Sequence, residues 1–473
     1  MPINSLPFIA FFSILTICFY SAPLRFRHTV LLFFSLLYFL SFGIVSILAL
    51  LAISGLGYNF LRNLQKQLVS NRWRILSVSV ILATWLGFKY LGDILAVISP
   101  FDLVKYNLEG WLLHPVGISF YSLQLLAVIL DFRSNAFPHT WKFRDVLLFL
   151  GFLPQSMAGP IHRQQELMPQ LIHMSTPFQA SNIFIGVKYL VWGYICKLIV
   201  GDKLALLAGY FLDNPEKSNG LTLLIGAGLY TFQIYFDFYG YSLIAIGLGR
   251  ILGIKVKVNF RHPYRSISFK EFWRRWHISL STWFRDYVYI PLGGNRRGYL
   301  RWILIVLVTF LLSGLWHGLG NNFLLWGAVH GLLLVLERFI HDKIYIPKNT
   351  LLSSMLGFAW RPIFFLILSM TWLIFRTEDI QILGEMMRKI FSVSDWAFTD
   401  VQQLIFQPNQ LFYLFLFMLA LVIEQWTRLD HWLDVVPKNT FQYGIHGVGF
   451  TLCGLLLILF GGLSGQEFLY FRF

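Results

Sequence analysis

The chain has 473 residues, of which 56% are hydrophobic and only 13% are charged. Because soluble globular proteins carry about 25% charged residues, this composition excludes an ordinary soluble fold. The net charge of +15 comes from Lys and Arg in short segments between apolar stretches, a distribution typical of cytoplasmic loops of membrane proteins. These basic residues form no separate hydrophilic domain, so we expect no nucleic-acid partner.

The N-terminal third of the sequence alternates apolar segments with loops of differing charge. Residues 1–28 contain an apolar core that lacks a positive start and precedes two arginines, which predicts a retained membrane helix rather than a cleaved signal peptide. The next apolar segments are residues 29–42, 43–60, 75–96 and 112–131. The loops 62–74 and 133–144 are basic, whereas residues 97–110 carry almost no positive charge. We therefore expect the basic loops in the cytoplasm and the N-terminus outside the cell membrane.

Apolar segments continue through the rest of the chain. They are residues 143–158, 182–212, 220–252, 301–318, 322–341, 354–375, 409–425 and 443–463. A membrane-spanning helix needs about 20 such residues, so the sequence predicts an all-α polytopic protein of the inner or plasma membrane with about eleven transmembrane helices. No internal repeat, low-complexity tract or linker divides the sequence, so we expect one multi-pass domain over residues 1–473.

The segment Ser266–Gly298 is too polar to cross lipid. Ser268 and Glu271 have the spacing of a capping box, which predicts the start of a helix. Apolar residues then recur on one helical face, namely Phe272, Trp276, Leu280, Phe284 and Tyr287. Such a helix lies in the membrane interface or packs into the helical bundle. Surface anchoring alone explains the apolar face but gives no role to His277.

His317 stands inside an almost wholly apolar stretch and is flanked by Gly314, Gly318 and Gly320. An ionisable residue at membrane depth suggests a functional site, although a hydrogen bond to a neighbouring helix is the alternative. Histidine has a pKa of about 6.5 in water, and this pKa falls when the ring leaves water, so a buried ring is neutral and can accept a proton from an alcohol. Metal-ligand spacing, a GxSxG motif and a phosphate-binding loop are all missing, which predicts no metal site and leaves direct transfer to a hydroxyl.

A family resemblance rests on two stretches, "NFRHPYRSISFKEFWRRWHISLSTWFRDYVYIPLGGNRRG" and "SGLWHG". They resemble the membrane-bound O-acyltransferases, and among these the bacterial branch that O-acetylates alginate. Three further stretches agree, "PVGISFYSLQ", "LPQSMAGPIHR" and "YTFQIYFDFYGYSLIAIGLGR", and the similarity covers roughly residues 25–340. The resemblance implies transmembrane and re-entrant helices that form a funnel, with His317 as the catalytic histidine at its narrow base and His277 as the second family histidine.

The resemblance also implies substrates and partners. The donor is acetyl-CoA or another acyl thioester from the cytoplasm, with no bound cofactor. The acceptor is a hydroxyl of an extracytoplasmic polysaccharide, or of an SGNH-type esterase-like partner protein that relays the acyl group. A hydrated polymer would lose hydration in an apolar funnel, which favours the relay. Eight residues form the predicted substrate-binding set: Trp316, Asn321, Asn322, Arg274, Arg275, Asp286, Gln233 and Asp237.

Three other functions are compatible with the sequence. A related branch, which transfers D-alanine to teichoic acid, shares "RRWHISLS" and "WFRDY" with this chain. A transporter of polysaccharide or lipid-linked sugar would also use buried His and Arg with broken helices, but the inverted repeat typical of transporters is not visible. A scaffold for polysaccharide export would need no chemistry, and it would tolerate replacement of His317.

Overall fold

The computed structural model describes residues 1–65, 71–98, 115–131, 141–156, 159–174, 177–296, 298–343, 351–398, 408–426 and 429–462. Most of the loop 97–110, and parts of the loops 62–74 and 133–144, lie outside the described residues. The membrane sides predicted for these loops therefore stay predictions.

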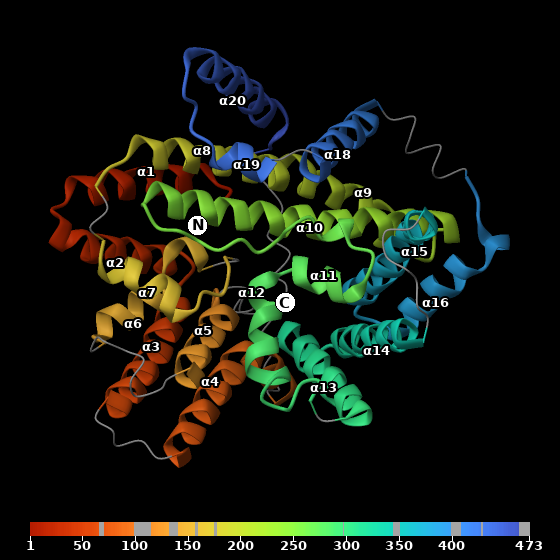
Figure 1. Cartoon of the computed structure of the whole chain (residues 1–473), viewed down its shortest axis with the longest axis horizontal. Helices are drawn as coiled ribbons and strands as arrows, with labels where there is room; N and C mark the ends of the chain where they lie inside the picture. Colours follow the sequence, from red (N-terminus) through yellow and green to blue (C-terminus); the bar gives the residue numbers. More distant parts are fainter. Residues whose placement is uncertain are drawn as a thin grey trace. The chain divides into compact units, whose positions relative to one another are not determined.

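Helices make up the regular structure, and the described residues contain no β-strand (Figure 1). Within the described part of the chain, seven helical stretches are long and apolar enough to cross a membrane: Ile44–Asn63, Ala180–Leu212, Gly220–Ile251, Tyr299–His317, Asn321–Asp342, Gly357–Arg376 and Thr440–Phe460. Shorter apolar helices occur at Leu6–Ser21, Ile118–Asp131 and Gln410–Gln425. The helices confirm the prediction of an all-α polytopic membrane protein.

One of the predicted apolar segments, residues 143–158, does not form a single spanning helix in its described part. It contains α6 (Phe143–Leu150) and, after a break, the 3-10 turn η2 (Leu153–Gln155). Eight helical residues rise about 12 Å, whereas the hydrocarbon core is about 30 Å thick. The segment is apolar because residues 145–150 are buried in the protein, where α6 packs on α3 (Ile44–Gln65). Hydropathy alone does not distinguish this burial from contact with lipid.

The described chain divides into two compact units. The first unit comprises Met1–Leu190 and Leu243–Lys257. Besides α3, α6 and η2, it holds α1 (Leu6–Ser21), α2 (Leu24–Leu40), α4 (Asn71–Ile98), α5 (Ile118–Asp131), α7 (Gln164–Ile172), most of α8 (Ala180–Tyr194) and the end of α10 (Gly220–Ile251). The single-domain organisation of residues 1–473 stays a prediction.

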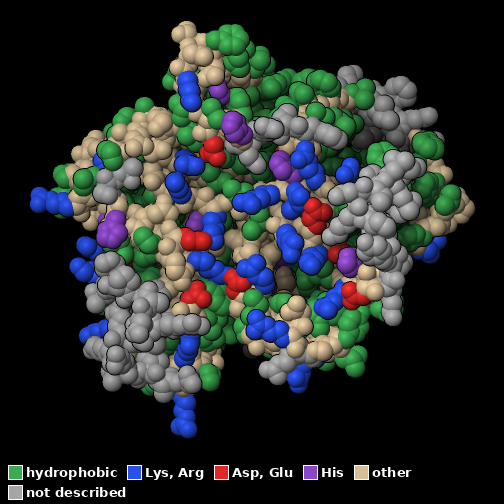
Figure 2. Space-filling view, in the orientation of Figure 1, with side chains coloured by type: hydrophobic (Ala, Val, Ile, Leu, Met, Phe, Trp, Pro, Cys, Tyr) green, Lys and Arg blue, Asp and Glu red, His purple; other side chains and the backbone are tan. Residues whose placement is uncertain are grey.

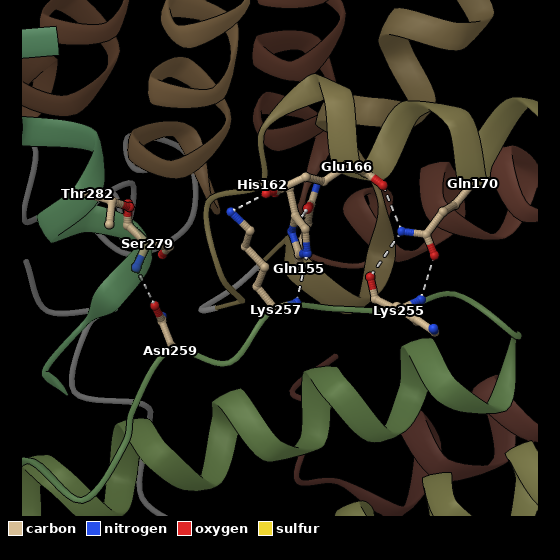
Figure 3. A network of polar contacts seen from close by, with 9 residues as sticks. All are labelled: Gln155, His162, Glu166, Gln170, Lys255, Lys257, Asn259, Ser279 and Thr282. Carbon is tan, nitrogen blue, oxygen red and sulfur yellow. Dashed lines mark hydrogen bonds and ion pairs between the residues drawn. The ribbon is translucent and has the colours of Figure 1, made fainter. Parts of the chain in front are cut away.

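A polar network in the first unit fixes the chain after α10 (Figure 3). The Nε2 atom of buried His162 accepts a hydrogen bond of 3.1 Å from the backbone N–H of Lys257, so Nδ1 carries the proton and donates to Gln155 Oε1 at 3.0 Å. Burial lowers the pKa of His162 to about 3, so the ring is neutral at pH 7. Lys257 also pairs with Glu166 of α7 at 2.6 Å. The network holds the segment against α7.

The second unit comprises Val191–Ser242 and Val258–Phe473. It holds the start of α10 and the elements η3 (Ile195–Gly201), α9 (Asp202–Leu212), η4 (Pro263–Arg265), α11 (Phe269–Arg275), α12 (Ile278–Phe284), η5 (Arg285–Tyr289), α13 (Tyr299–His317), α14 (Asn321–Lys343), α15 (Leu351–Arg376), α16 (Ile380–Phe391), η6 (Val393–Asp395), α18 (Pro408–Trp426), α19 (Leu429–Asp434) and α20 (Thr440–Phe460). Helices α13 and α14 pack closely (Figure 1). A Cβ at Gly314 would lie 2.3 Å from the carbonyl oxygen of Phe323, so glycine permits this approach.

The amphipathic segment Ser266–Gly298 begins as predicted and then breaks. Ser268 caps α11, because its hydroxyl accepts the backbone N–H of Glu271 at 3.1 Å. A single continuous helix does not form: α11 ends at Arg275, and α12 starts only after His277, whose φ is +41°. The predicted apolar face is buried in the unit at Phe272, Trp276, Leu280 and Phe284. Of the two predicted locations, packing into the bundle is the one observed.

Candidate active site

His317 is the last residue of α13, and its side chain is buried within a set of aromatic rings. Its ring meets Trp326 of α14 edge-on, with centroids 5.3 Å apart, and Phe375 of α15 edge-on at 5.0 Å. The neighbouring Trp316 ring lies 4.7 Å away. Three helices thus enclose the imidazole in apolar surface, as its position in the sequence predicted.

The end of α15 is fixed beside His317 by an amide side chain. Asn322 is fully buried, and its Nδ2 donates a hydrogen bond of 2.8 Å to the backbone carbonyl of Phe375. This bond satisfies a carbonyl that the end of a helix leaves unpaired. The Oδ1 atom of Asn322 has no hydrogen-bond partner within the described chain. Asn322 therefore holds the Phe375 ring against His317 and keeps one acceptor available.

His277 also contacts the ring of Trp316. Its ring centroid is 6.2 Å from that of Trp316 and 4.7 Å from that of Phe238, which it meets edge-on. Burial lowers the pKa of His277 to about 3, so the ring is neutral at pH 7. The two predicted catalytic histidines both contact one tryptophan, Trp316, a member of the predicted substrate-binding set.

The backbone of His277 adopts an unfavourable conformation that Asn259 stabilises. A φ of +41° is uncommon for a residue with a Cβ and costs conformational energy. The backbone carbonyl of Asn259 accepts the N–H of Ile278 at 2.9 Å, and its Oδ1 accepts the N–H of Ser279 at 3.0 Å (Figure 3). By accepting both hydrogen bonds, Asn259 stabilises the turn at which the His277 side chain is buried.

Four members of the predicted substrate-binding set lie toward the surface instead. Arg274 and Asn321 are exposed. Arg275 pairs with Glu271 at 2.8 Å, and Asp286 pairs with its neighbour Arg285, also at 2.8 Å. Figure 2 shows Lys and Arg side chains gathered over the region of α11. These charged groups belong to a basic surface rather than to the aromatic enclosure of His317.

The remaining two members of the set, Gln233 and Asp237, line a cavity of about 610 Å³. Lys197, only 1% exposed, pairs with Asp202 at 2.6 Å and also with Asp237. It lies in the π-helical turn η3, and π-bulges often occur at functional sites. Gly240 of α10 permits close packing, since a Cβ there would lie 2.9 Å from the backbone nitrogen of Lys197.

The cavity and the His317 enclosure share the last turn of α15. Arg376 lines the cavity and forms an ion pair with Asp213, which also lines it. The preceding residue, Phe375, packs on the His317 ring. Two consecutive residues at the end of α15 thus contact the polar cavity and the buried imidazole, respectively.

A comparison with known families identifies this arrangement. Residues 34–377 match the model of the membrane-bound O-acyltransferase family, MBOAT. The chain belongs to this family. The match contains His277, His317 and every residue of the cavity, whereas the helices from α16 onward lie beyond it.

Several bacterial proteins resemble this MBOAT chain. A probable alginate O-acetylase from Pseudomonas putida is 36% identical over 340 residues, which cover 71% of this chain and 67% of that protein. A peptidoglycan O-acetyltransferase from Helicobacter pylori is 30% identical over 380 residues, covering 73% and 70%. A teichoic acid D-alanyltransferase from Bacillus subtilis is 28% identical over 319 residues, covering 60% and 80%. The chain spans about two thirds of the length of the alginate O-acetylases it matches.

In the described part of the second unit, the sequence interpretation of this MBOAT chain missed three buried charged residues. Lys197 and Asp202 lie in the apolar segment 182–212, and Glu424 lies in the segment 409–425. Glu424 is fully buried, and its Oε1 accepts the hydroxyl of Tyr235 at 2.6 Å and lies 2.7 Å from Nδ1 of His262. The rule that an ionisable residue in a membrane helix indicates function was applied to His317 alone. Applied to every apolar segment, it would have found all three.

Proposed function

We propose that the chain is a membrane O-acyltransferase in which His317 is the general base. A ring nitrogen of His317 takes the proton of an acceptor hydroxyl as the hydroxyl oxygen attacks the carbonyl carbon of an acyl thioester. The C–O bond forms, the C–S bond breaks, and the proton passes to the departing thiolate. The single observation that carries the proposal is the burial of His317 among aromatic rings of three helices, one of which, Phe375, directly precedes the cavity-lining Arg376.

The enclosure suits this chemistry for a physical reason. Apolar walls exclude water, which would otherwise hydrolyse the thioester, and they stabilise an uncharged imidazole that can accept a proton. His277 is neutral at pH 7 and contacts Trp316, so we assign it the role of orienting the groups around His317. The unpaired Oδ1 of Asn322 is a hydrogen-bond acceptor for a bound substrate.

The names of the relatives support an acetyl group and a polysaccharide acceptor. The alginate O-acetylase and the peptidoglycan O-acetyltransferase are 36% and 30% identical to this chain, whereas the teichoic acid D-alanyltransferase is 28% identical. We therefore favour acetyl transfer from acetyl-CoA, and D-alanyl transfer is the second candidate. The accepting hydroxyl belongs to a polysaccharide or to a serine of an SGNH-type partner protein. Both routes bring one hydroxyl to His317.

An assay in liposomes tests this function and separates the two routes. The purified chain receives acetyl-CoA labelled in its acetyl group and a candidate polysaccharide, with or without an SGNH-type protein. We expect label on the acceptor only when chain and donor are both present. Label on the polymer without a second protein would establish direct transfer, and label on the partner's serine would establish the relay. An absence of label on either acceptor, with donor and chain intact, would contradict the function.

The distribution of charge supports an orientation in the inner or plasma membrane. Arg296 and Arg301 lie where α13 begins, and Arg338 lies near the end of α14, so this end of the helix pair is basic. By the positive-inside rule this end faces the cytoplasm, and His317, at the opposite end of α13, lies toward the outside. We propose that the N-terminus lies outside, as the basic loops 62–74 and 133–144 predict.

Cysteine labelling checks the orientation. In a chain whose Cys18, Cys196 and Cys453 are replaced by serine, we expect Glu216→Cys, in the exposed turn between α9 and α10, to react with a membrane-impermeant thiol reagent added outside. Arg296→Cys is the matched exposed position at the basic end and should react only after the membrane is opened. Outside labelling of Arg296→Cys but not Glu216→Cys would reverse the topology.

A further inference from the structure

The cavity lined by Gln233 and Asp237, called here the η3–α15 cavity, is built from η3, α9, α10, the turn between α9 and α10, and the end of α15. Its volume of about 610 Å³ lies in the range of sites that enclose a small-molecule ligand. Its polar residues include Lys197, Asp202, Gln233, Asp237 and Arg376. We propose that this cavity binds an uncharged, hydroxyl-rich sugar chain, which presents one hydroxyl to the transfer site. The inference rests on the proposed acyltransferase function and names its acceptor class.

The lining has the composition of a sugar site rather than a lipid site. Ten of the sixteen lining residues are charged or carry an amide or an aliphatic hydroxyl. An acyl chain in the cavity would remove water from these polar groups without forming hydrogen bonds to them. Sugar hydroxyls, in contrast, both donate and accept hydrogen bonds. The loss of hydration that disfavours a polymer in an apolar funnel therefore does not apply to this cavity.

Gln233 gives the cavity an unmet hydrogen-bonding requirement. Its side chain lines the cavity and is only 6% exposed, and its Oε1 has no hydrogen-bond partner within the described chain. Buried polar atoms in proteins are nearly always paired, and exceptions call for an explanation such as a bound molecule. A sugar hydroxyl that donates to Oε1 supplies the missing partner.

The charges of the cavity favour a neutral sugar over a uronate. Lys197 is already shared by Asp202 and Asp237, so this inner cluster carries one more negative than positive charge. Arg376 is engaged by Asp213. Over the whole lining, three carboxylates (Asp202, Asp213 and Asp237) balance three cations (Lys197, Lys217 and Arg376), and two of these cations are already paired. A sugar carboxylate would thus find no excess of positive charge, and near the inner cluster it would be repelled by like charge.

The position of the cavity connects sugar binding to transfer. Arg376 lines the cavity, and the preceding Phe375 packs on the ring of His317 with centroids 5.0 Å apart. Two consecutive residues at the end of α15 therefore connect the lining of the cavity to the packing around the imidazole. Binding there would hold the acceptor hydroxyl near the base, which is how binding sites convert affinity into rate.

Direct binding measurements test the proposal on the full chain in lipid nanodiscs. The probes are a β-1,4-linked glucose tetramer and a β-1,4-linked mannuronate tetramer, each measured by equilibrium dialysis. We expect the neutral tetramer to bind at least about tenfold more tightly than the uronate. Gln233→Leu should weaken the neutral tetramer by about tenfold, the effect of losing one buried hydrogen bond. Gln381→Leu, on the exposed first turn of α16, is the matched control and should bind normally.

A second variant keeps the test decisive if Gln233→Leu fails to fold. Ala205→Phe fills the cavity from α9 and should abolish binding while the thermal midpoint stays near that of the unaltered chain. Equal or tighter binding of the uronate, or unchanged binding in both cavity variants, would overturn the proposal. Binding should persist in His317→Ala, because the sugar needs no general base. Sugar binding without acyl transfer would therefore refute only the proposed function, and transfer to a partner without sugar binding would refute only this inference.

Discussion

Replacing His317 by alanine is expected to lower kcat for acyl transfer by about 10²- to 10⁴-fold, the range for loss of a general base. The imidazole is the titratable group that Trp326 and Phe375 enclose, and alanine leaves the acceptor hydroxyl without a proton acceptor there. Sugar binding and insertion into the membrane should be unaffected. The measurement is the initial rate of label transfer from acetyl-CoA in liposomes, normalised to the amount of folded protein.

A buried histidine elsewhere in the second unit provides the control for this experiment. His446 of α20 is also buried, and its ring stacks on Trp432 with centroids 4.8 Å apart. His446→Ala removes the same side chain without touching the enclosure of His317, so it should retain near-normal transfer. If the two variants lost activity equally, packing rather than proton transfer would explain the loss. Retention of normal transfer by His317→Ala would disprove the assignment of the base.

The sequence singles out His317 and His277 because their signal is local, and their catalytic roles stay predictions. His317 follows an apolar helix and precedes a glycine, and this alone marks a ring that leaves water. His277 has a weaker local signal, its position beside Trp276 on an apolar face. The left-handed backbone at His277 is stabilised by Asn259. Asn259 lies outside the segment Ser266–Gly298, so the residue pattern of that segment does not reveal this contact. A continuous helix was therefore the natural, and wrong, expectation for this segment.

The polar cavity was beyond prediction because its parts come from separate segments. Gln233 and Asp237 belong to α10, Lys197 to the π-helical turn η3 and Arg376 to the end of α15. A single charged residue lowers the mean hydropathy of an apolar segment only slightly, so hydropathy does not reveal the cavity. The pairing of Lys197 with Asp237 depends on the close approach of η3 to α10 at Gly240. Sequence can indicate that a buried charge needs a partner, but the fold selects that partner.

Replacing Lys197 by methionine is expected to lower the free energy of unfolding by about 3–5 kcal/mol, the usual cost of removing one member of a buried ion pair. The substitution keeps the apolar length of the side chain but leaves Asp202 and Asp237, both buried, facing each other without their shared ammonium. Reversible unfolding of the purified chain in detergent measures the loss. Lys438→Met is the control on an exposed lysine and should change the free energy by no more than about 0.5 kcal/mol.

Neutralising the two carboxylates separates charge from packing in the same experiment. If the destabilisation arises from uncompensated carboxylates, then adding Asp202→Asn and Asp237→Asn to Lys197→Met should recover most of the lost free energy, because no buried charge of the cluster remains unpaired. If it arises from the shape of the π-helical turn, the triple variant should stay as unstable as the single one. A Lys197→Met chain as stable as Lys438→Met would show that the ammonium contributes nothing to the fold. Burying a charge costs hydration free energy, which some interaction must offset. If the ion cluster did not stabilise the fold, interaction with the bound ligand would have to offset this cost.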